Sequence, residues 1–181
     1  MPASSLRLFF ALWPDAATRV TLFQIAHDIV AETGGRPVAA ENLHLTLAFL
    51  GERPAAMLPD LCASVSAIEV SPGRLFLDDV GCWRKTGIAW LAGTKPATQL
   101  LALRERVVQA LASVQIVIDE RRFMPHVTLA RRVETLIARQ IMPPIEWQVD
   151  SFALVVSTLA SRGVRYEVLQ TFGLTAARDG P

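Results

Sequence analysis

The stretch "ENLHLTLAFLGE", residues 41–52, contains two polar side chains in an otherwise apolar run. Its apolar positions alternate with the others: Leu43, Leu45, Leu47 and Phe49. This period of two predicts a β-strand with one buried face, so His44 and Thr46 project together from the opposite face. Burying a polar pair is costly unless it has partners. The pair is therefore either a hydrogen-bonded structural feature or part of a functional site.

The same pattern recurs in "HVTLARR" at 126–132, 82 residues after the first copy. Both copies have the form His-x-Thr-Leu-Ala. Strict alternation gives each copy one face made of His, Thr and Ala. In the first copy this face consists of His44, Thr46 and Ala48. In the second copy it consists of His126, Thr128 and Ala130. Two such strands could present two imidazoles and two hydroxyls to one cleft.

This set of groups suits displacement at a phosphodiester. A histidine titrates near pH 6.5, so one imidazole can accept a proton while the other donates one. Threonine hydroxyls and an arginine can bind the phosphate oxygens, and no metal is needed to stabilise the charge. The repeat favours a functional role for His44 and His126, whereas His27 lies outside the pattern and is interpreted as structural or surface-exposed.

Other interpretations of the motifs remain open. A single histidine in a strand is more often structural, and threonine is a good strand former. Two histidines could also bind a metal, but neither motif has a third ligand at i+2 to i+4. The two cysteines, Cys62 and Cys82, form no CxxC and are expected to be free thiols.

The composition is typical of one domain of 181 residues without a membrane span. Mean hydropathy is +0.33, yet the longest apolar runs, at 8–13 and 152–156, fall far short of the ~20 residues a span requires. We find no export signal and expect a cytoplasmic monomer. The net charge of +1 argues against coating a long polyanion, although four arginines could hold a small anion: Arg121, Arg122, Arg131 and Arg132.

Periodicity and turn signals predict an α+β protein with mainly antiparallel sheets and outer helices. Strands are expected at 6–13, 43–50 (closed by Gly51), 74–80, 87–93, 126–132, 146–159 and 165–174, with a hairpin turn at Arg162-Gly163. Helices are expected from Pro14-Asp15 to Gly34-Gly35, at 54–69 and 96–112, and as a short piece at 134–140. The tail "AARDGP" is expected to fray.

Three segments together, "RLFFALWP", "NLHLTLAFLG" and "FMPHVTLAR", resemble the 2H phosphoesterase superfamily. Within it they resemble the RNA 2′,3′-cyclic phosphodiesterases, also called 2′-5′ RNA ligase-like proteins. The resemblance implies a bilobal fold of two antiparallel sheets with outer helices and a central cleft between pseudo-symmetric lobes. The resemblance runs from the first strand to near the C-terminus, and residues 1–181 are expected to form one domain with half-motifs at 44–47 and 126–129.

The resemblance also implies an activity: hydrolysis of a terminal RNA 2′,3′-cyclic phosphate to a 2′-phosphate, with no metal or cofactor. By position, His44 is the proton donor to the departing 3′ oxygen and His126 the proton acceptor. The implied phosphate-binding residues are Thr46, Thr128 and Arg131. Strict alternation instead places Arg132 on the His126 face, unless a bulge turns Arg131 towards it.

The substrates this implies are RNA ends or nucleotides bearing a 2′,3′-cyclic phosphate, and Phe9 or Phe10 could stack on a base. Three alternatives remain at this stage. The chain could be a 2′-5′ RNA ligase acting on tRNA halves at the same site, a non-catalytic binder of RNA ends or nucleotides, or a metal hydrolase.

Overall fold

The computed structural model describes residues 5–95, 97–118, 123–135, 137–160 and 163–176. Its strands are β1 (Ser5–Leu12), β2 (Arg36–Pro37), β3 (Leu45–Pro54), β4 (Gly73–Trp83), β5 (Ile88–Ala92), β6 (Val127–Arg131), β7 (Arg139–Val149), β8 (Ser151–Ala160) and β9 (Gly163–Gly173). Its α-helices are α1 (Ala16–Thr33), α2 (Leu58–Ser66) and α3 (Thr98–Ser113), with 3₁₀ turns η1 (Ala40–Asn42) and η2 (Ala55–Met57).

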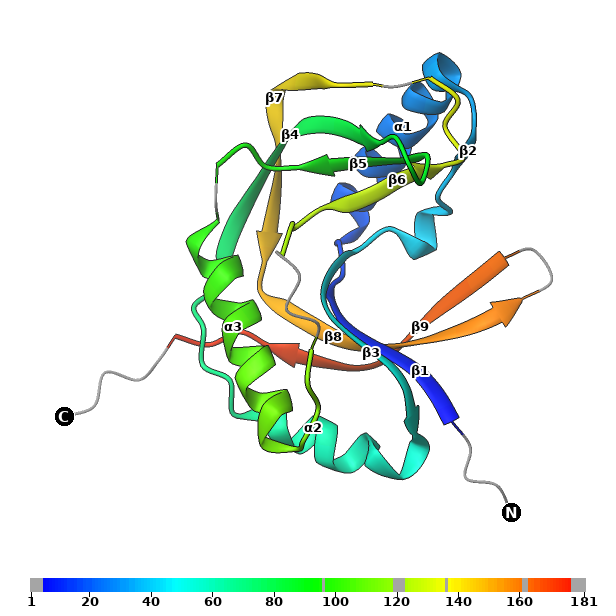
Figure 1. Cartoon of the computed structure of the whole chain (residues 1–181). Coiled ribbons are helices and arrows are strands. Elements are labelled where there is room, and N and C mark those ends of the chain that lie inside the picture. Colours follow the sequence, from blue (N-terminus) through cyan, green and yellow to red (C-terminus); the bar gives the residue numbers. More distant parts are fainter. Residues whose placement is uncertain (1–4, 96, 119–122, 136, 161–162, 177–181) are drawn as a thin grey trace.

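The strands pair antiparallel in the order β7-β4-β5-β6-β3-β1-β8-β9, and β2 adds to β6. Two four-stranded halves, β7-β4-β5-β6 and β3-β1-β8-β9, meet where β6 lies beside β3. A single residue pair, Leu45 with Val127, makes this junction, and both side chains are fully buried. The predicted α+β class is confirmed, and the two motif strands are the innermost strands of the two halves (Figure 1).

The helices pack outside the sheet halves. Helix α1 follows β1 in the chain but covers the other half, β7-β4-β5-β6. It packs on β6 and β7, whereas α3 contacts β3 and β4, and α2 lies on α3 and β9. Asp15 caps the start of α1 by accepting hydrogen bonds from the backbone and side chain of Thr18. Gly34, with a φ of 71°, ends the helix as predicted.

Two of the expected elements are longer or shorter in the structure. The strand expected at 43–50 continues through Gly51 to Pro54 as β3. The helix expected at 54–69 is η2 followed by α2 and ends at Ser66. Arg162 of the expected hairpin turn and the end of the tail lie outside the described residues.

Two predictions in the last third of the chain are wrong. The helical piece expected at 134–140 is absent from its described residues, and β7 begins at Arg139. Pro143 and Pro144 lie inside β7, which tolerates them because it is an edge strand whose pairing with β4 is interrupted there. The strand expected at 146–159 is two strands, since the chain leaves β4 at Asp150 and joins β1 in the other half.

Within the described ranges, no helix is long and apolar enough to cross a membrane.

Candidate active site

The junction of β3 and β6 brings the two motifs together. Because Leu45 lies opposite Val127 in an antiparallel pair, continuing the register by one residue sets His44 across from Thr128. The same step on the other side sets Thr46 across from His126. Directly opposite residues share a face, so all four polar side chains emerge together on the face away from the buried Leu45.

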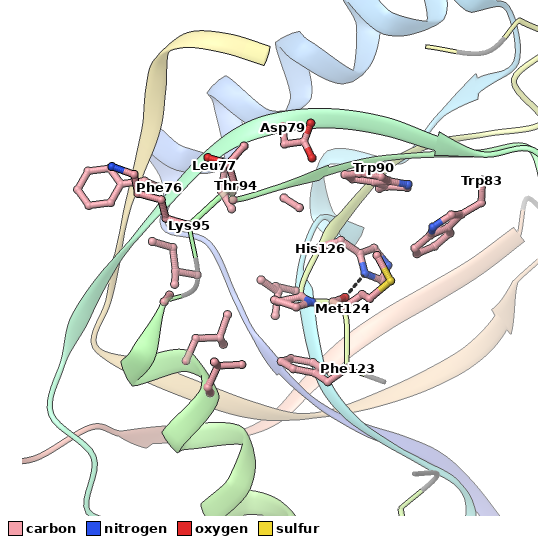
Figure 2. A pocket seen from close by; sticks show the side chains of 18 residues that line it. Phe76, Leu77, Asp79, Trp83, Trp90, Thr94, Lys95, Phe123, Met124 and His126 are labelled. Carbon is pink, nitrogen blue, oxygen red and sulfur yellow. Dashed lines mark hydrogen bonds between the residues drawn. The ribbon is translucent and has the colours of Figure 1, made fainter. Parts of the chain in front are cut away.

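Each imidazole is oriented by the carbonyl oxygen two residues before it. His44 Nδ1 lies 2.7 Å from the Asn42 oxygen. His126 Nδ1 lies 2.6 Å from the Met124 oxygen, and Figure 2 marks this second hydrogen bond with a dashed line. A carbonyl only accepts, so Nδ1 carries the proton in both rings and donates it. In the neutral rings, Nε2 is therefore left as the proton-accepting atom, and that of His44 lies 3.0 Å from the Thr46 hydroxyl.

Aromatic side chains surround His44. Trp13 stacks on its ring with centroids 5.5 Å apart, and Phe9 and Tyr166 contact it at 5.0 and 5.1 Å. This burial lowers the pKa of His44 to about 4, and the positive charges of His126 and Arg131 act in the same direction. The ring is consequently neutral at pH 7 in the ligand-free protein.

His126 is less enclosed than His44. Trp83 contacts the edge of its ring at a centroid distance of 4.7 Å. Burial lowers the pKa of His126 as well, and the Arg131 charge adds to the effect, while the hydrogen bond to the Met124 carbonyl opposes it. A neutral His126 has Nε2 available as a base.

Both motif strands contain a β-bulge directly after the threonine, which sequence alternation did not predict. In β6 the pairing with β5 skips Leu129, and in β3 the pairing with β1 skips Leu47. In each motif, Leu and the following Ala are both buried in the core, so placing Ala48 and Ala130 on the histidine face is wrong.

The bulges move the next residue into the third place on the histidine face. In β6 this residue is Arg131, whose charge acts on both imidazoles, and in β3 it is Phe49, which is 66% exposed. Arg132 follows the end of β6 with a φ of 57°. The geometry thus brings Arg131 to the site, as the family resemblance implies and strict alternation does not.

The two phenylalanines of β1 have different surroundings. Phe10 belongs to the main core, whereas Phe9 lies on the site face in a small cluster with Ala11, Ala153 and Val155. Phe9 is only 2% exposed beneath His44, Phe49 and Tyr166. It supports the site from below and is not accessible for stacking on a base in this arrangement.

The remaining predicted residues lie away from the site or outside the described ranges. His27 is exposed on α1 and contacts Phe23, and both cysteines are free. Arg121 and Arg122 are not among the described residues. In the part of the chain that the structure describes, no group of three or more His, Cys, Asp or Glu side chains could hold a metal ion.

Sequence reasoning missed the residues that position the two rings. Asn42 accepts from His44 through its carbonyl, while its side chain donates to the Val164 carbonyl and accepts from the Tyr166 backbone. It thereby ties the first motif to β9. A backbone carbonyl leaves no mark in the sequence, so only the shared spacing of two residues before each histidine could have pointed to it.

The chain is similar to known proteins along most of its length. The model of the 2′-5′ RNA ligase superfamily matches residues 12–159. The RNA 2′,3′-cyclic phosphodiesterase of Escherichia coli (strain K12) is 35% identical over 93% of this chain and 97% of its own length. That of Thermus thermophilus is also 35% identical, over 93% of this chain and 90% of its own.

Solved structures extend the likeness to three dimensions. The crystal structure of E. coli LigT complexed with 3′-AMP has a TM-score of 0.83 and 33% identity, covering 95% of this chain and 99% of that one. The chain therefore belongs to the 2′-5′ RNA ligase superfamily. This confirms the family resemblance of the two motifs and the expectation of an enzyme of the phosphodiesterase class.

Proposed function

We propose that the protein hydrolyses terminal 2′,3′-cyclic phosphates of RNA to 2′-phosphates by metal-independent catalysis with two histidines. The observation that carries the proposal is the meeting of His44, Thr46, His126 and Thr128 on one face of the β3–β6 junction. Support also comes from the curated relatives, whose name is RNA 2′,3′-cyclic phosphodiesterase.

His126 is the proposed general base. Its Nδ1 proton is held by the Met124 carbonyl, so Nε2 can accept a proton from water. The water oxygen forms a bond to phosphorus while the bond from phosphorus to the 3′ oxygen breaks. The product then carries a 2′-phosphate and a free 3′ hydroxyl.

His44 is the proposed general acid that protonates the departing 3′ oxygen. With a pKa of about 4 in the ligand-free protein, it must gain a proton when substrate binds. A phosphodiester anion between the rings supplies the negative charge that favours the imidazolium form. Nε2–H of His44 then donates to the 3′ oxygen, since Nδ1–H remains bound to the Asn42 carbonyl.

Thr46, Thr128 and Arg131 are the proposed phosphate-binding residues. The two hydroxyls stand beside the two imidazoles across the strand junction. Arg131 brings a permanent positive charge whose effect reaches both rings. Such charge-assisted hydrogen bonds stabilise the charge that builds up on the phosphoryl oxygens in the transition state.

The proposal is tested with an RNA that ends in a 2′,3′-cyclic phosphate, assayed in excess EDTA. Substituting His44→Ala or His126→Ala should each lower kcat by about 10²- to 10⁴-fold with the circular dichroism spectrum unchanged. His27→Ala is the matched control because this histidine is exposed on α1. Full activity in either motif variant, or loss of wild-type activity in EDTA, would contradict the proposal.

The same residues would serve 2′-5′ ligation, in which the 5′ hydroxyl of a second RNA attacks the cyclic phosphate in place of water and the 3′ oxygen again leaves, and the matching family is described as the 2′-5′ RNA ligase superfamily. An assay on tRNA halves that carry a cyclic phosphate distinguishes the two nucleophiles when the joined and the hydrolysed ends are both measured. We expect hydrolysed ends to predominate.

Tight binding of a 2′-phosphate nucleotide without any turnover would instead indicate a non-catalytic binder. The proposal includes action as a cytoplasmic monomer.

A further inference from the structure

A pocket of about 390 Å³ adjoins the candidate active site on the His126 side. Its lining includes His126 and Trp83 near the motif and Asp79 and Trp90 on the sheet (Figure 2). Ala92 of β5 and Leu101 of α3 line it as well. A volume of this size lies within the range of small-molecule sites. Apart from His126 and Met124, the residues of the lining have no part in the proposed catalytic steps.

The strand register sets the pocket on the same face as His126. Trp90 lies opposite Thr128 in the β5–β6 pair and opposite Gly81 in the β4–β5 pair. Asp79, two residues before Gly81, lies opposite Ala92, two residues after Trp90. Opposite residues share a face, so the pocket extends the surface that presents His126 and Thr128.

Gly81 allows Trp90 to lie flat against the sheet. A Cβ at Gly81 would stand 2.3 Å from Cζ2 of the Trp90 ring, which no side chain could tolerate. Phe123 lines the pocket as well, and the Arg104 guanidinium of α3 lies 4.6 Å from its ring centroid. Two aromatic rings held in this way suit a flat aromatic ligand.

Three large apolar side chains of the lining are strongly exposed without a covering partner in the described residues. These are Phe76 and Met124, each 51% exposed, and Leu101, 44% exposed. Exposed apolar surface around a pocket next to a polar site favours a ligand that buries it.

The polar side chains that line the pocket are Asp79, Thr94 and Lys95, together with the ring nitrogens of Trp83, Trp90 and His126. Both oxygens of Asp78 accept hydrogen bonds from Thr94, so Asp78 holds the turn after β5. Asp79, by contrast, lines the pocket, and an ionised carboxylate is purely an acceptor. Lys95 of the lining is a donor only, so a ligand that stacks on aromatic rings and offers both N–H donors to Asp79 and an acceptor to Lys95 fits the pocket.

We infer that this pocket binds the base of the substrate nucleotide and that Asp79 accepts hydrogen bonds from its Watson–Crick edge. The inference rests on the proposed function, because a cyclic phosphate beside His126 is joined through its ribose to a base. Guanine offers two neighbouring donors, N1–H and N2–H, whereas adenine, cytosine and uracil each offer a donor from one nitrogen only. The expected order of affinity is guanine first, then adenine for its larger stacking area, then the pyrimidines.

The direct test is calorimetric binding of the four 2′-nucleoside monophosphates to the protein, a readout that needs no turnover. We expect 2′-GMP to bind about tenfold more tightly than 2′-UMP. Asp79→Asn keeps the shape but replaces one acceptor oxygen by a donor, and it should abolish the guanine preference. Asp60→Asn, on the exposed surface of α2, is the matched control and should leave the preference unchanged. Equal affinities for all four nucleotides, or a guanine preference that survives Asp79→Asn, would overturn the inference.

Hydrolysis of a base-free substrate, methyl riboside 2′,3′-cyclic phosphate, separates the two proposals. If the wild-type protein does not hydrolyse it or any cyclic nucleotide but still prefers 2′-GMP, the base pocket stands and the proposed function fails. If it hydrolyses all cyclic nucleotides with equal KM and binds the four products equally, the proposed function stands and the base pocket fails.

Discussion

At the residue scale, the two imidazoles are held by matching contacts from the two halves of the chain. The sequence predicts both His-x-Thr pairs because period-two alternation leaves them on the polar face of a strand. It does not predict the contacts of Asn42 and Met124, because these residues act through backbone carbonyls. Nor does it predict the aromatic enclosure of His44, since Trp13 and Tyr166 come from distant parts of the chain.

The enclosure of His44 predicts a pKa that depends on the ligand. Burial holds its pKa at about 4 in the free protein, and a phosphate between the rings should raise it by one unit or more. Titration of the ring signals by NMR, with and without saturating inorganic phosphate, measures both values. A His44 pKa near 6.5 without phosphate, or one that phosphate leaves unchanged, would contradict the proposed acid.

The two adjacent arginines predict unequal effects on substrate binding. Arg131 faces the imidazoles because of the bulge, so Arg131→Ala should raise KM about 10- to 100-fold through loss of a charge-assisted hydrogen bond. Arg132→Ala removes the same charge one residue further on and is the matched control. We expect it to change KM by less than twofold. Equal effects of the two substitutions would show that Arg131 has no specific contact with the phosphate.

At the scale of elements, the bulges after Thr46 and Thr128 turn the chain so that Phe49 and Arg131 complete the site face. A bulge depends on how two strands pair, and strict alternation within one strand cannot reveal it. The same limit explains the missed boundary at Asp150, where the sequence continues smoothly but the partner strand changes from β4 to β1.

Two glycines with positive φ predict different costs of adding a side chain. A Cβ at Gly35 would stand 2.7 Å from the Arg131 oxygen, whereas one at Gly51 meets nothing within 4 Å. Gly51→Ala should therefore cost only the strain of its backbone conformation, about 1 kcal/mol or ~2–4 °C in Tm.

Gly35→Ala adds a collision with β6 to that strain, so its Tm should fall at least twice as far. Thermal unfolding followed by circular dichroism measures both variants against the wild type. The close approach of Gly35 to the end of β6 would be refuted by equal shifts in Tm.

At the scale of the whole molecule, two antiparallel halves meet where β6 lies beside β3 (Figure 1). One buried residue pair makes this junction, and the polar residues flanking that pair form the candidate site. The fold class could be predicted because most strands and helices have clear periodicity. The packing of α1 on the opposite half of the sheet could not be predicted. An amphipathic stripe shows which side of a helix is buried but not which strands cover it.

Burial of neutral His44 predicts that the protein loses stability as the pH falls. The pKa is about 4 folded and about 6.5 unfolded, so the unfolded state binds more protons between these values. The stabilising contribution of neutral His44 is complete above pH 6.5 and is lost towards pH 4, by about 3 kcal/mol at most.

Urea unfolding at pH 7.5 and pH 4.5 tests this for the wild type and for His44→Gln, which cannot titrate. The free energy of unfolding should fall more steeply with acid in the wild type, and the difference between the two proteins isolates His44 from His126. Parallel losses in both proteins would show that His44 titrates normally in the folded state.

The central claim is that the two motifs form one site in which the 3′ oxygen leaves from the phosphorus. Phosphorus NMR of the products from an RNA dinucleotide 2′,3′-cyclic phosphate, incubated in excess EDTA, tests it directly. We predict a single product with a 2′-phosphate from the wild type, and none from His44→Ala or His126→Ala. A 3′-phosphate product, or an unreacted cyclic phosphate with the wild-type protein, would contradict the account.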